Sequence, residues 1–470
     1  MVSATGRLLI APLTCPYRLA SQVFRLGIAR TVHGLVAALR GDHLTVRKGP
    51  APVTLVTHPT TGPDTTTFRA LANRAPALIV FTHLRWGGVF QRPQHLLSRF
   101  ARALPVTVVE EPVFRPGIPD AGEVTVSRDG DVTVLTPVFR ERPDQPFGFT
   151  PDNVVEIARL IGPHLGTAGT VGVTAGERSS AGVTSRAAGP IVWYYTPMAL
   201  GALPTAIAPS LVIFDAMDDL ASFRGAPPAL REREAAMFAA ADLVFTGGPS
   251  LFAARRDRHR SVHCFPSGVD ASHFGRAAGD IEPPAELASL VGPVLGFYGV
   301  LDERIDFELI AAVADARCDW QLALVGPLAK ISEADLPRRP NITYFGQRRY
   351  ADLPAFLAGF DVALLPFALN EATRSISPTK TLEYLAGEKP VVSTPIADVV
   401  SLYGDVVRIA ADAPDFIAAI DAALDEPPPE RARRRAAGQA HLVAHDWDAI
   451  AAGMASLITG AMTISEDATF

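Results

Sequence analysis

The chain has 470 residues, 48% of them hydrophobic and 20% charged, which is the composition of a globular protein with two or three domains. Its formal net charge of -6 argues against nucleic acid as the main partner, because phosphate binding needs a basic surface. The three cysteines, Cys15, Cys264 and Cys318, form no CxxC pair, and no cleavable signal peptide is apparent. We therefore expect a cytoplasmic protein without a bound metal.

The first 48 residues carry seven cations and one acid, Asp42, so their local balance is 7 - 1 = +6. Between Arg18 and Arg40, basic and apolar residues fall on different sides at helical spacing. Such a helix can lie on an anionic membrane surface, in which case the protein is peripheral on the inner membrane face, or it can be a packed or frayed N-terminal helix. Residues 49–75, rich in Thr and Pro, are expected to be a linker.

From residue 76 onward, short apolar runs alternate with helical patterns. The sequence predicts strands at 77–81, 105–111, 131–137, 191–197, 211–217, 242–248 and 262–268, and helices at 92–104, 152–160 and 228–241. Residues 166–189, mostly Gly, Ala, Ser and Thr, are expected to form a flexible insertion or lid. The uncharged stretch 187–214 is long enough for a membrane span, but prolines interrupt it, and we interpret it as two strands with a loop between them.

A second series of the same kind starts near Gly292. The sequence predicts strands at 292–299, 320–327, 342–346, 361–367, 389–394 and 406–410, and helices at 306–316, 350–358, 380–385 and 415–424. Strands that are apolar throughout and alternate with helices are typical of parallel sheets covered on both faces. We predict an α/β fold of two doubly wound, Rossmann-like domains with a cleft between them, and divide the chain into 1–75, 76–285, 286–440 and 441–470.

The first predicted strand of the first domain leads directly into the loop THLRWGGVFQRPQHLL, residues 82–97. Ligands bind beyond the carboxyl ends of strands in such folds, so this loop is a candidate site. Glycines allow close backbone approach, and the start of the following helix attracts an anion or a polar group. The candidate contacts are His83, Arg85, Trp86, Gly87, Gly88 and Arg92. The alternative is a structural turn in which Trp86 covers the sheet edge and Arg92 bonds to carbonyl groups.

A cluster of acids ends another strand of the first domain, in the segment IFDAMDDLASF. Asp215, Asp218 and Asp219 lie close together in the sequence and can act as a base on an acceptor hydroxyl or hold sugar hydroxyls. They can equally cap the helix that follows. No matching histidine cluster supports a metal site there.

The first strand-to-helix turn of the second domain, GFYGVLDERIDF, has two glycines without the GxGxxG spacing, which makes a dinucleotide site a weak hypothesis. Gly299 ends the strand, and Arg304 is placed to meet a phosphate near the helix start. The alternative for Arg304 is a surface ion pair with Asp302 or Asp306.

The segment ATRSISPTKTLEYLAGEKPVVSTP, residues 372–395, is the most specific in the chain. Ser377, Thr379 and Lys380 cluster at the start of a predicted helix, where hydroxyls and an ammonium suit a diphosphate. Glu383 follows one turn later and can bind two vicinal hydroxyls through its two oxygens. The alternative is a capping network with a surface glutamate.

On these residues the chain resembles glycosyltransferases with the GT-B fold, of the group called family 1 or 4-like, over about residues 76–460. The segments HLRWGGVFQRPQHLL, VVEEPV, YYTP and FDAMDD resemble a bacterial branch that includes teichuronic-acid-type transferases. The resemblance implies that the second domain binds the donor, with Glu383 on the ribose, Ser377, Thr379 and Lys380 along the diphosphate, and Val325, Gly326 and the 345–346 region near the base. It implies that the first domain receives the acceptor near Asp218 and the loop 82–97.

Two positions depart from the family pattern. A glutamate that often stands eight residues before the ribose-binding one is Ser375 here, which puts a donor-sugar contact in doubt. An arginine that often follows the glycine of the first turn is Val300 here, which leaves Arg304 and Lys380 as the diphosphate cations.

These features predict a metal-independent hexosyltransferase that moves a sugar from a nucleotide-diphosphate sugar to a hydroxyl acceptor. We expect the donor to be a UDP-sugar and the acceptor to be a compound such as a lipid-linked glycan. The expected process is bacterial cell-envelope polysaccharide or glycolipid synthesis. Asp218 and His83 are the expected catalytic residues, and no cofactor is expected. The alternatives are a GT-B-fold epimerase, which needs no acceptor pocket, a phosphorylase, which carries a cofactor lysine, and a non-catalytic nucleotide-sugar-binding partner.

Overall fold

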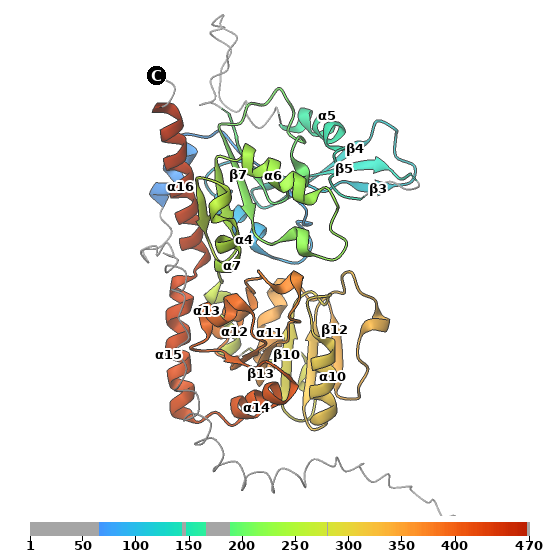
Figure 1. Cartoon of the computed structure of the whole chain (residues 1–470), viewed down its shortest axis with the longest axis vertical. Coiled ribbons are helices and arrows are strands. Elements are labelled where there is room, and N and C mark those ends of the chain that lie inside the picture. The colour runs from blue at the N-terminus through green and yellow to red at the C-terminus, as the bar shows by residue number, and fades with distance from the viewer. Residues whose placement is uncertain (1–64, 143–146, 166–188, 280, 468–470) are drawn as a thin grey trace, which may run out of the picture.

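The structure, a computed structural model, describes residues 65–142, 147–165, 189–279 and 281–467. It consists of two α/β domains, one above the other in Figure 1, which the C-terminal helices connect along one side. The basic segment 1–48 and nearly all of the expected insertion 166–189 lie outside the described residues.

The first domain is built on a nine-stranded sheet with the path β3-β5-β2-β1-β6-β7-β8-β9, in which β4 pairs with β5. Its strands are β1 (Leu78–Thr82), β2 (Val106–Glu110), β3 (Val113–Arg115), β4 (Glu123–Asp129), β5 (Val132–Arg140), β6 (Ile191–Tyr194), β7 (Leu211–Ala216), β8 (Leu243–Thr246) and β9 (Val262–Cys264). All pairs are parallel except β4 with β5. β1 and β2 are buried at every position, as strands covered on both faces must be.

Two hydrophobic clusters cover the faces of this sheet. The helices of the domain are α4 (Arg92–Phe100), α5 (Val154–Leu165), α6 (Leu230–Ala240) and α7 (Pro249–Arg255). The antiparallel β4 was not predicted, because its residues are nearly all exposed and lack an apolar run. The stretch 187–214 forms β6 and β7, as expected, and within the described part of the chain no helix has the length and apolar character needed to cross a membrane.

The second domain is built on a parallel six-stranded sheet with the order β12-β11-β10-β13-β14-β15. Its strands are β10 (Val294–Tyr298), β11 (Gln321–Val325), β12 (Ile342–Gly346), β13 (Val362–Leu365), β14 (Val391–Ser393) and β15 (Arg408–Ile409). The helices are α8 (Ala271–Gly275), α9 (Ala285–Ala288), α10 (Phe307–Ala316), α11 (Leu353–Ala358), α12 (Lys380–Ala386), α13 (Ala397–Tyr403) and α14 (Ala413–Leu424). One hydrophobic cluster forms the core of this domain.

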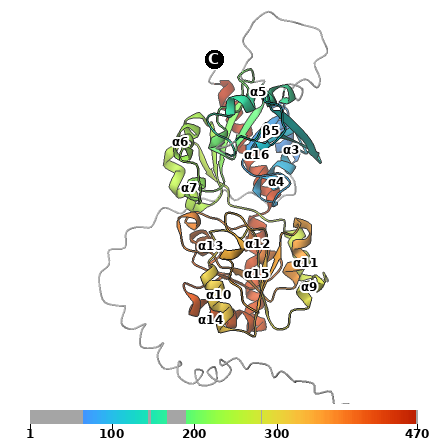
Figure 2. The ribbon, with the colours of Figure 1, turned by 90° about the vertical axis from the view of Figure 1, so that its right-hand side faces the viewer.

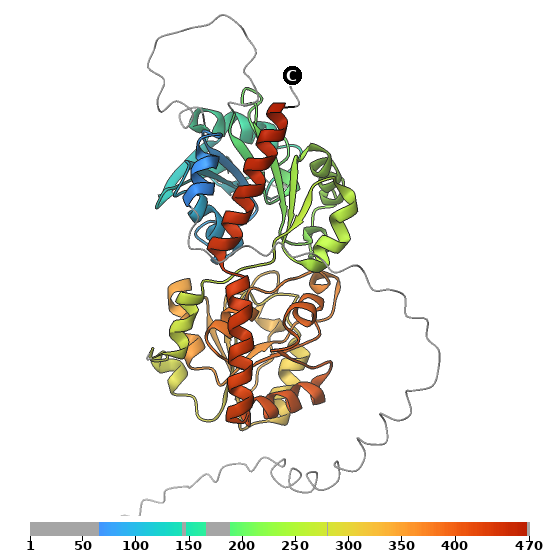
Figure 3. The same ribbon diagram turned by 90° about the vertical axis from the view of Figure 1, so that its left-hand side faces the viewer.

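The chain ends in two long helices that run along both domains, as Figures 2 and 3 show from opposite sides. α15 (Pro428–Ala444) packs against α12 of the second domain, and α16 (Trp447–Asp467) crosses to the first. Trp447, Ile450 and Met454 of α16 belong to the core of the first domain. α3 (Thr65–Ala72) packs against α16, so the C-terminal part of the expected linker 49–75 is helical.

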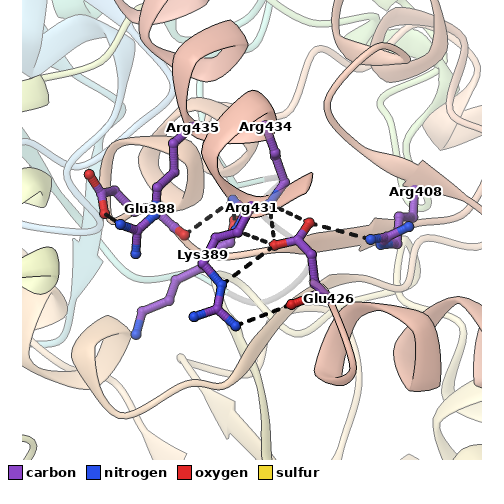
Figure 4. A network of polar contacts seen from close by, with 7 residues as sticks. All are labelled: Glu388, Lys389, Arg408, Glu426, Arg431, Arg434 and Arg435. Atoms are coloured by element: carbon purple, nitrogen blue, oxygen red, sulfur yellow. Dashed lines mark hydrogen bonds and ion pairs between the residues drawn. The ribbon is translucent and has the colours of Figure 1, made fainter. Parts of the chain in front are cut away.

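A buried carboxylate holds α15 on the second domain (Figure 4). Glu426 is 3% exposed and accepts hydrogen bonds from Arg434 at 3.0–3.2 Å and from Arg408 at 3.3 Å. Arg434 also donates to the carbonyl oxygens of Glu388 and Lys389, at 3.1 Å each. The charged segment PERARRRA, residues 429–436, thus has one arginine, Arg434, that points inward.

The Glu426→Gln variant tests this anchor. Removing the charge leaves Arg434 buried without its counter-ion, and we expect the free energy of unfolding to fall by about 3 kcal/mol. Urea denaturation followed by circular dichroism measures the change. Glu430→Gln, at an exposed position on α15, serves as the control. An equal effect of the two substitutions would contradict the proposed anchoring role of Glu426.

Candidate active site

The carboxyl ends of the two sheets face each other across a cavity between the domains. The cavity encloses about 770 Å³, part of it open to solvent. Arg92, Asp218 and Ser267 line it from the first domain and the segment that leaves it. Arg304 and the run 377–380 line it from the second. The structure thus brings four predicted donor-side residues together with two residues of the predicted acceptor side.

Arg85 and Trp86 of the loop after β1 do not line this cavity. The Arg85 guanidinium donates to Glu110 Oε2 at 3.2 Å and to the carbonyl of Pro112 at 3.2 Å. The Trp86 indole N–H donates to Asp129 Oδ2 at 2.8 Å. These contacts tie the loop to β2 and to the β4–β5 hairpin, as in the structural alternative. Gly87 and Gly88 are exposed on the same loop.

Arg92 begins α4 and forms a buried ion pair at the floor of the cavity. Its side chain is 2% exposed, and its Nε donates to Asp215 Oδ2 at 3.1 Å, where Asp215 is fully buried. Its Nη1 donates to the carbonyl oxygen of Phe265 at 2.8 Å, which realises the carbonyl contact of the structural alternative. The remaining nitrogen, Nη2, is buried and has no partner in the described part of the protein. Arg92 therefore has a structural role at the cavity, with one guanidinium nitrogen left buried and unpartnered.

The two expected catalytic residues occupy different places. Asp218 lines the cavity, and burial raises the pKa of its carboxyl, while Arg304 and Arg92 oppose part of this rise. His83 lies outside the cavity lining, and burial lowers the pKa of its imidazole to about 4, with a further contribution from Lys330. His83 is therefore neutral at pH 7, the form in which an imidazole can accept a hydrogen bond or a proton but is not a charged acid.

Three glycines with positive φ form a cradle at the carboxyl ends of β10, β11 and β12. Gly299, Gly326 and Gly346 have φ values of 153°, 152° and 68°. A Cβ on Gly326 would lie 1.7 Å from the carbonyl oxygen of Gly299, and one on Gly299 would lie 2.6 Å from Cε of Lys380. The N–H of Gly326 donates to the carbonyl of Gly346 at 2.9 Å. Only glycine lets these strand ends and Lys380 approach so closely.

Hydroxyls and cations meet on the second domain's side of the cavity. Ser377, Thr379 and Lys380 line it together with Arg304. The Arg304 guanidinium binds Asp302 at 2.7–3.1 Å, which is the ion pair expected as the alternative, yet it also lies at the cavity wall. Burial lowers the pKa of the Lys380 ammonium, and Glu383 opposes part of this shift. Two fixed cations and two hydroxyls suit an anionic group such as a diphosphate.

Glu383 lies on α12, one turn after Thr379, and is 8% exposed. Burial raises the pKa of its carboxyl, while Lys380 and the hydroxyl of Tyr298 oppose the rise. It is therefore not the surface glutamate of the alternative reading. Ser375, which stands where the family pattern has its first glutamate, is outside the cavity lining.

Contacts between the domains lie outside the lining of the cavity, and the sequence did not predict them. Asp398 of α13 accepts a hydrogen bond from the N–H of Ser250 at 2.9 Å. Nearby, a Cβ added to Gly248 would lie 2.7 Å from Cβ of Ser377, so the two domains approach closely there. On the loop after β1, the ring of Phe90 stacks on Tyr350 of the second domain at 4.6 Å between centroids. The glycine pair in TGGPS was the one sequence signal for such a close approach. Among the described residues, no group of three or more His, Cys, Asp and Glu side chains could hold a metal ion.

The fold and the site define a class: two facing Rossmann-like domains with a cation-lined cavity, the GT-B fold of glycosyltransferases. The chain is similar to sucrose-phosphate synthase from Thermosynechococcus elongatus, with a TM-score of 0.57 and 15% identity over 81% of this chain and 98% of that one. An E. coli trehalose-6-phosphate protein bound with UDP-2-fluoro glucose gives a TM-score of 0.57 and 14% identity, covering 82% and 99%. At such identities the likeness shows the fold alone, and it confirms the predicted fold class.

Sequence comparison narrows the resemblance. Residues 292–426 match the family model described as Glycosyl transferases group 1, which confirms the expected resemblance for the second domain. Over 171 residues the chain is 30% identical to TuaH of Bacillus subtilis (strain 168), which is named for a proposed role as a teichuronic acid biosynthesis glycosyltransferase. The matched region spans 35% of this chain and 43% of that protein.

The glycine cradle generates a stability prediction. We expect Gly326→Ala to lower the free energy of unfolding by about 3 kcal/mol. The new Cβ would clash with a backbone oxygen, and alanine disfavours the positive φ at this position. Gly346→Ala is the matched control, with positive φ but open space around its Cβ, and should cost about 1 kcal/mol. Urea unfolding of both variants measures the difference. Equal losses would show that the close approach of Gly299 and Gly326 does not matter.

Proposed function

We propose that the protein is a glycosyltransferase that moves a sugar from a nucleotide-diphosphate sugar to a hydroxyl acceptor in cell-surface polysaccharide or glycolipid synthesis. The observation that carries this proposal is the convergence of Lys380, Arg304, Ser377 and Thr379 on one cavity, across which Asp218 faces from the other domain. The family match of residues 292–426 and the relative in teichuronic acid biosynthesis support the same reaction and process.

The donor binds mainly to the second domain in this proposal. Lys380 and Arg304 neutralise the diphosphate, with Ser377 and Thr379 as hydroxyl donors, and the glycine cradle lets the nucleoside approach the strand ends. Glu383 accepts hydrogen bonds from the ribose. A UDP-sugar is the proposed donor, supported by the structural neighbours that are described as UDP-forming or as bound with UDP-2-fluoro glucose.

In the proposed reaction, the bond between the sugar and the diphosphate breaks as the acceptor oxygen attacks the sugar. Lys380 and Arg304 stabilise the charge that develops on the leaving diphosphate, in the role that a metal ion fills in other transferases. Asp218 accepts the proton of the acceptor hydroxyl as its oxygen attacks. The contacts of Asp398 and Tyr350 with the first domain keep water away from the reacting sugar.

A second candidate is a non-catalytic partner that binds nucleotide sugars. The serine at position 375, where the family pattern has a glutamate, favours it, because a contact to the donor sugar is then absent. Binding of a nucleotide sugar without release of the nucleoside diphosphate, with every acceptor tested, would support this candidate and contradict the transferase.

We also propose that residues 1–48 hold the protein at the inner membrane face, where a lipid-linked glycan acceptor is found. Their balance of +6 suits anionic lipids. Deleting residues 1–48 should abolish sedimentation with anionic vesicles, and unchanged sedimentation would remove this part of the proposal.

Substitution of Lys380 tests the donor site. Lys380→Ala should lower kcat/KM for the donor about 100- to 1000-fold, because one preorganised charge on the leaving group is lost. Lys389→Ala, which changes a lysine of the same domain outside the cavity, should stay within about twofold of the wild type. Release of the nucleoside diphosphate is the measurement. Wild-type turnover in Lys380→Ala would contradict the assigned role.

The pH dependence tests Asp218. Because burial raises its pKa, the base is deprotonated only above an elevated pKa, and kcat/KM should fall as the pH drops through that value. The acid limb should therefore lie above about 3.9, the ordinary value for aspartate. Asp218→Asn should lower the rate about 100-fold or more and remove this limb. An unchanged acid limb in that variant would assign the base to another group.

A further inference from the structure

We propose that the acceptor side of the cavity selects an uncharged hydroxyl compound, such as a neutral glycan, and discriminates against acceptors with a phosphate or carboxylate beside the reacting hydroxyl. This inference rests on the proposed transferase function and adds the class of acceptor. It follows from how the cationic side chains of the first domain are already used.

Arg92, which lines the cavity from the first domain, has its charge neutralised by the buried carboxylate of Asp215. Arg92 and Asp215 form a buried ion pair of 3.1 Å, so the pair has no net charge to offer an anionic ligand. Arg92 lines the cavity, but its unpartnered Nη2 is buried below the surface, so the pair presents no free positive charge there.

The neighbouring arginines are also occupied by carboxylates of the same domain. Arg85 binds Glu110 at 3.2 Å. Arg255, on the helix after β8, binds Asp219 at 2.8 Å and Glu234 at 3.1 Å. The sequence has no lysine between Lys48 and Lys330, so no lysine of this domain can add a positive charge.

Asp218 is the remaining charged group on this wall. Its carboxylate makes no ion pair with a cation of the first domain within the described residues, and it repels a ligand that carries a negative charge. A hydroxyl group can donate its hydrogen to the Asp218 carboxylate, whereas a phosphate dianion or a carboxylate has no hydrogen to donate.

Matched acceptor pairs test the inference with the full-length protein. Glucose, galactose, mannose and N-acetylglucosamine are each compared with their 6-phosphates, by release of UDP from saturating UDP-sugar. We expect kcat/KM to be at least about tenfold higher for the neutral member of any pair that reacts. Where no sugar reacts, calorimetric binding of each pair in saturating UDP replaces the rate. A 6-phosphate that reacts or binds as well as its neutral form, or better, overturns the inference.

A charge added to the same wall supplies a second test. Ser267→Lys places a cation at the cavity, and Ser267→Gln is its neutral control of similar length. The lysine variant alone should shift the preference about tenfold toward the 6-phosphates. If the ratio of kcat/KM for the 6-phosphate to kcat/KM for the neutral sugar is equal in both variants, the charge of the cavity wall does not set the acceptor preference. Failure of UDP-sugars to bind the wild type at all would instead overturn the proposed function, so the two failures are distinguishable.

Discussion

The buried ion pair between Arg92 and Asp215 organises the carboxyl edge of the first sheet. It joins the start of α4, the end of β7 and, through the carbonyl of Phe265, the segment after β9. Both side chains are almost completely buried, so their mutual attraction and the hydrogen bond to the Phe265 carbonyl must offset the cost of desolvation. Asp218 lies three residues beyond Asp215, and its position at the cavity depends on this arrangement. A structural ion pair therefore sets the place of the proposed base.

The second domain reaches the same cavity by a different means. There, glycines at the ends of β10 and β11 have no side chains, so the two strand ends can approach each other closely. The Lys380 side chain can likewise lie against Gly299. Lys380 and Arg304 then line the cavity together with the hydroxyls of Ser377 and Thr379. This contrast explains why one side of the cavity offers charge for a diphosphate and the other offers neutral polar groups.

The fold could be predicted from the sequence because its strands are short apolar runs in a regular alternation with helices. The grouping of Ser377, Thr379 and Lys380 at one cavity could be predicted as well, since they are neighbours in the sequence and follow a buried strand. The contacts of Arg85 and Trp86 could not, because Glu110 and Asp129 are distant in the sequence and nothing local marks the pairing. The inward direction of Arg434 also escaped prediction, because its partner Glu426, eight residues earlier, lies before α15 and outside the helical pattern of the segment.

The two domains complete the site only where they touch. Asp398 approaches Ser250 and Gly248 beside Ser377, and Phe90 stacks on Tyr350, so both contacts lie next to residues of the cavity or of its loops. Any ligand that draws Lys380 and Asp218 toward each other also favours these contacts, because they belong to the same arrangement of the domains. In the proposed reaction, exclusion of water from the sugar and alignment of donor with acceptor would therefore depend on the same arrangement of the domains.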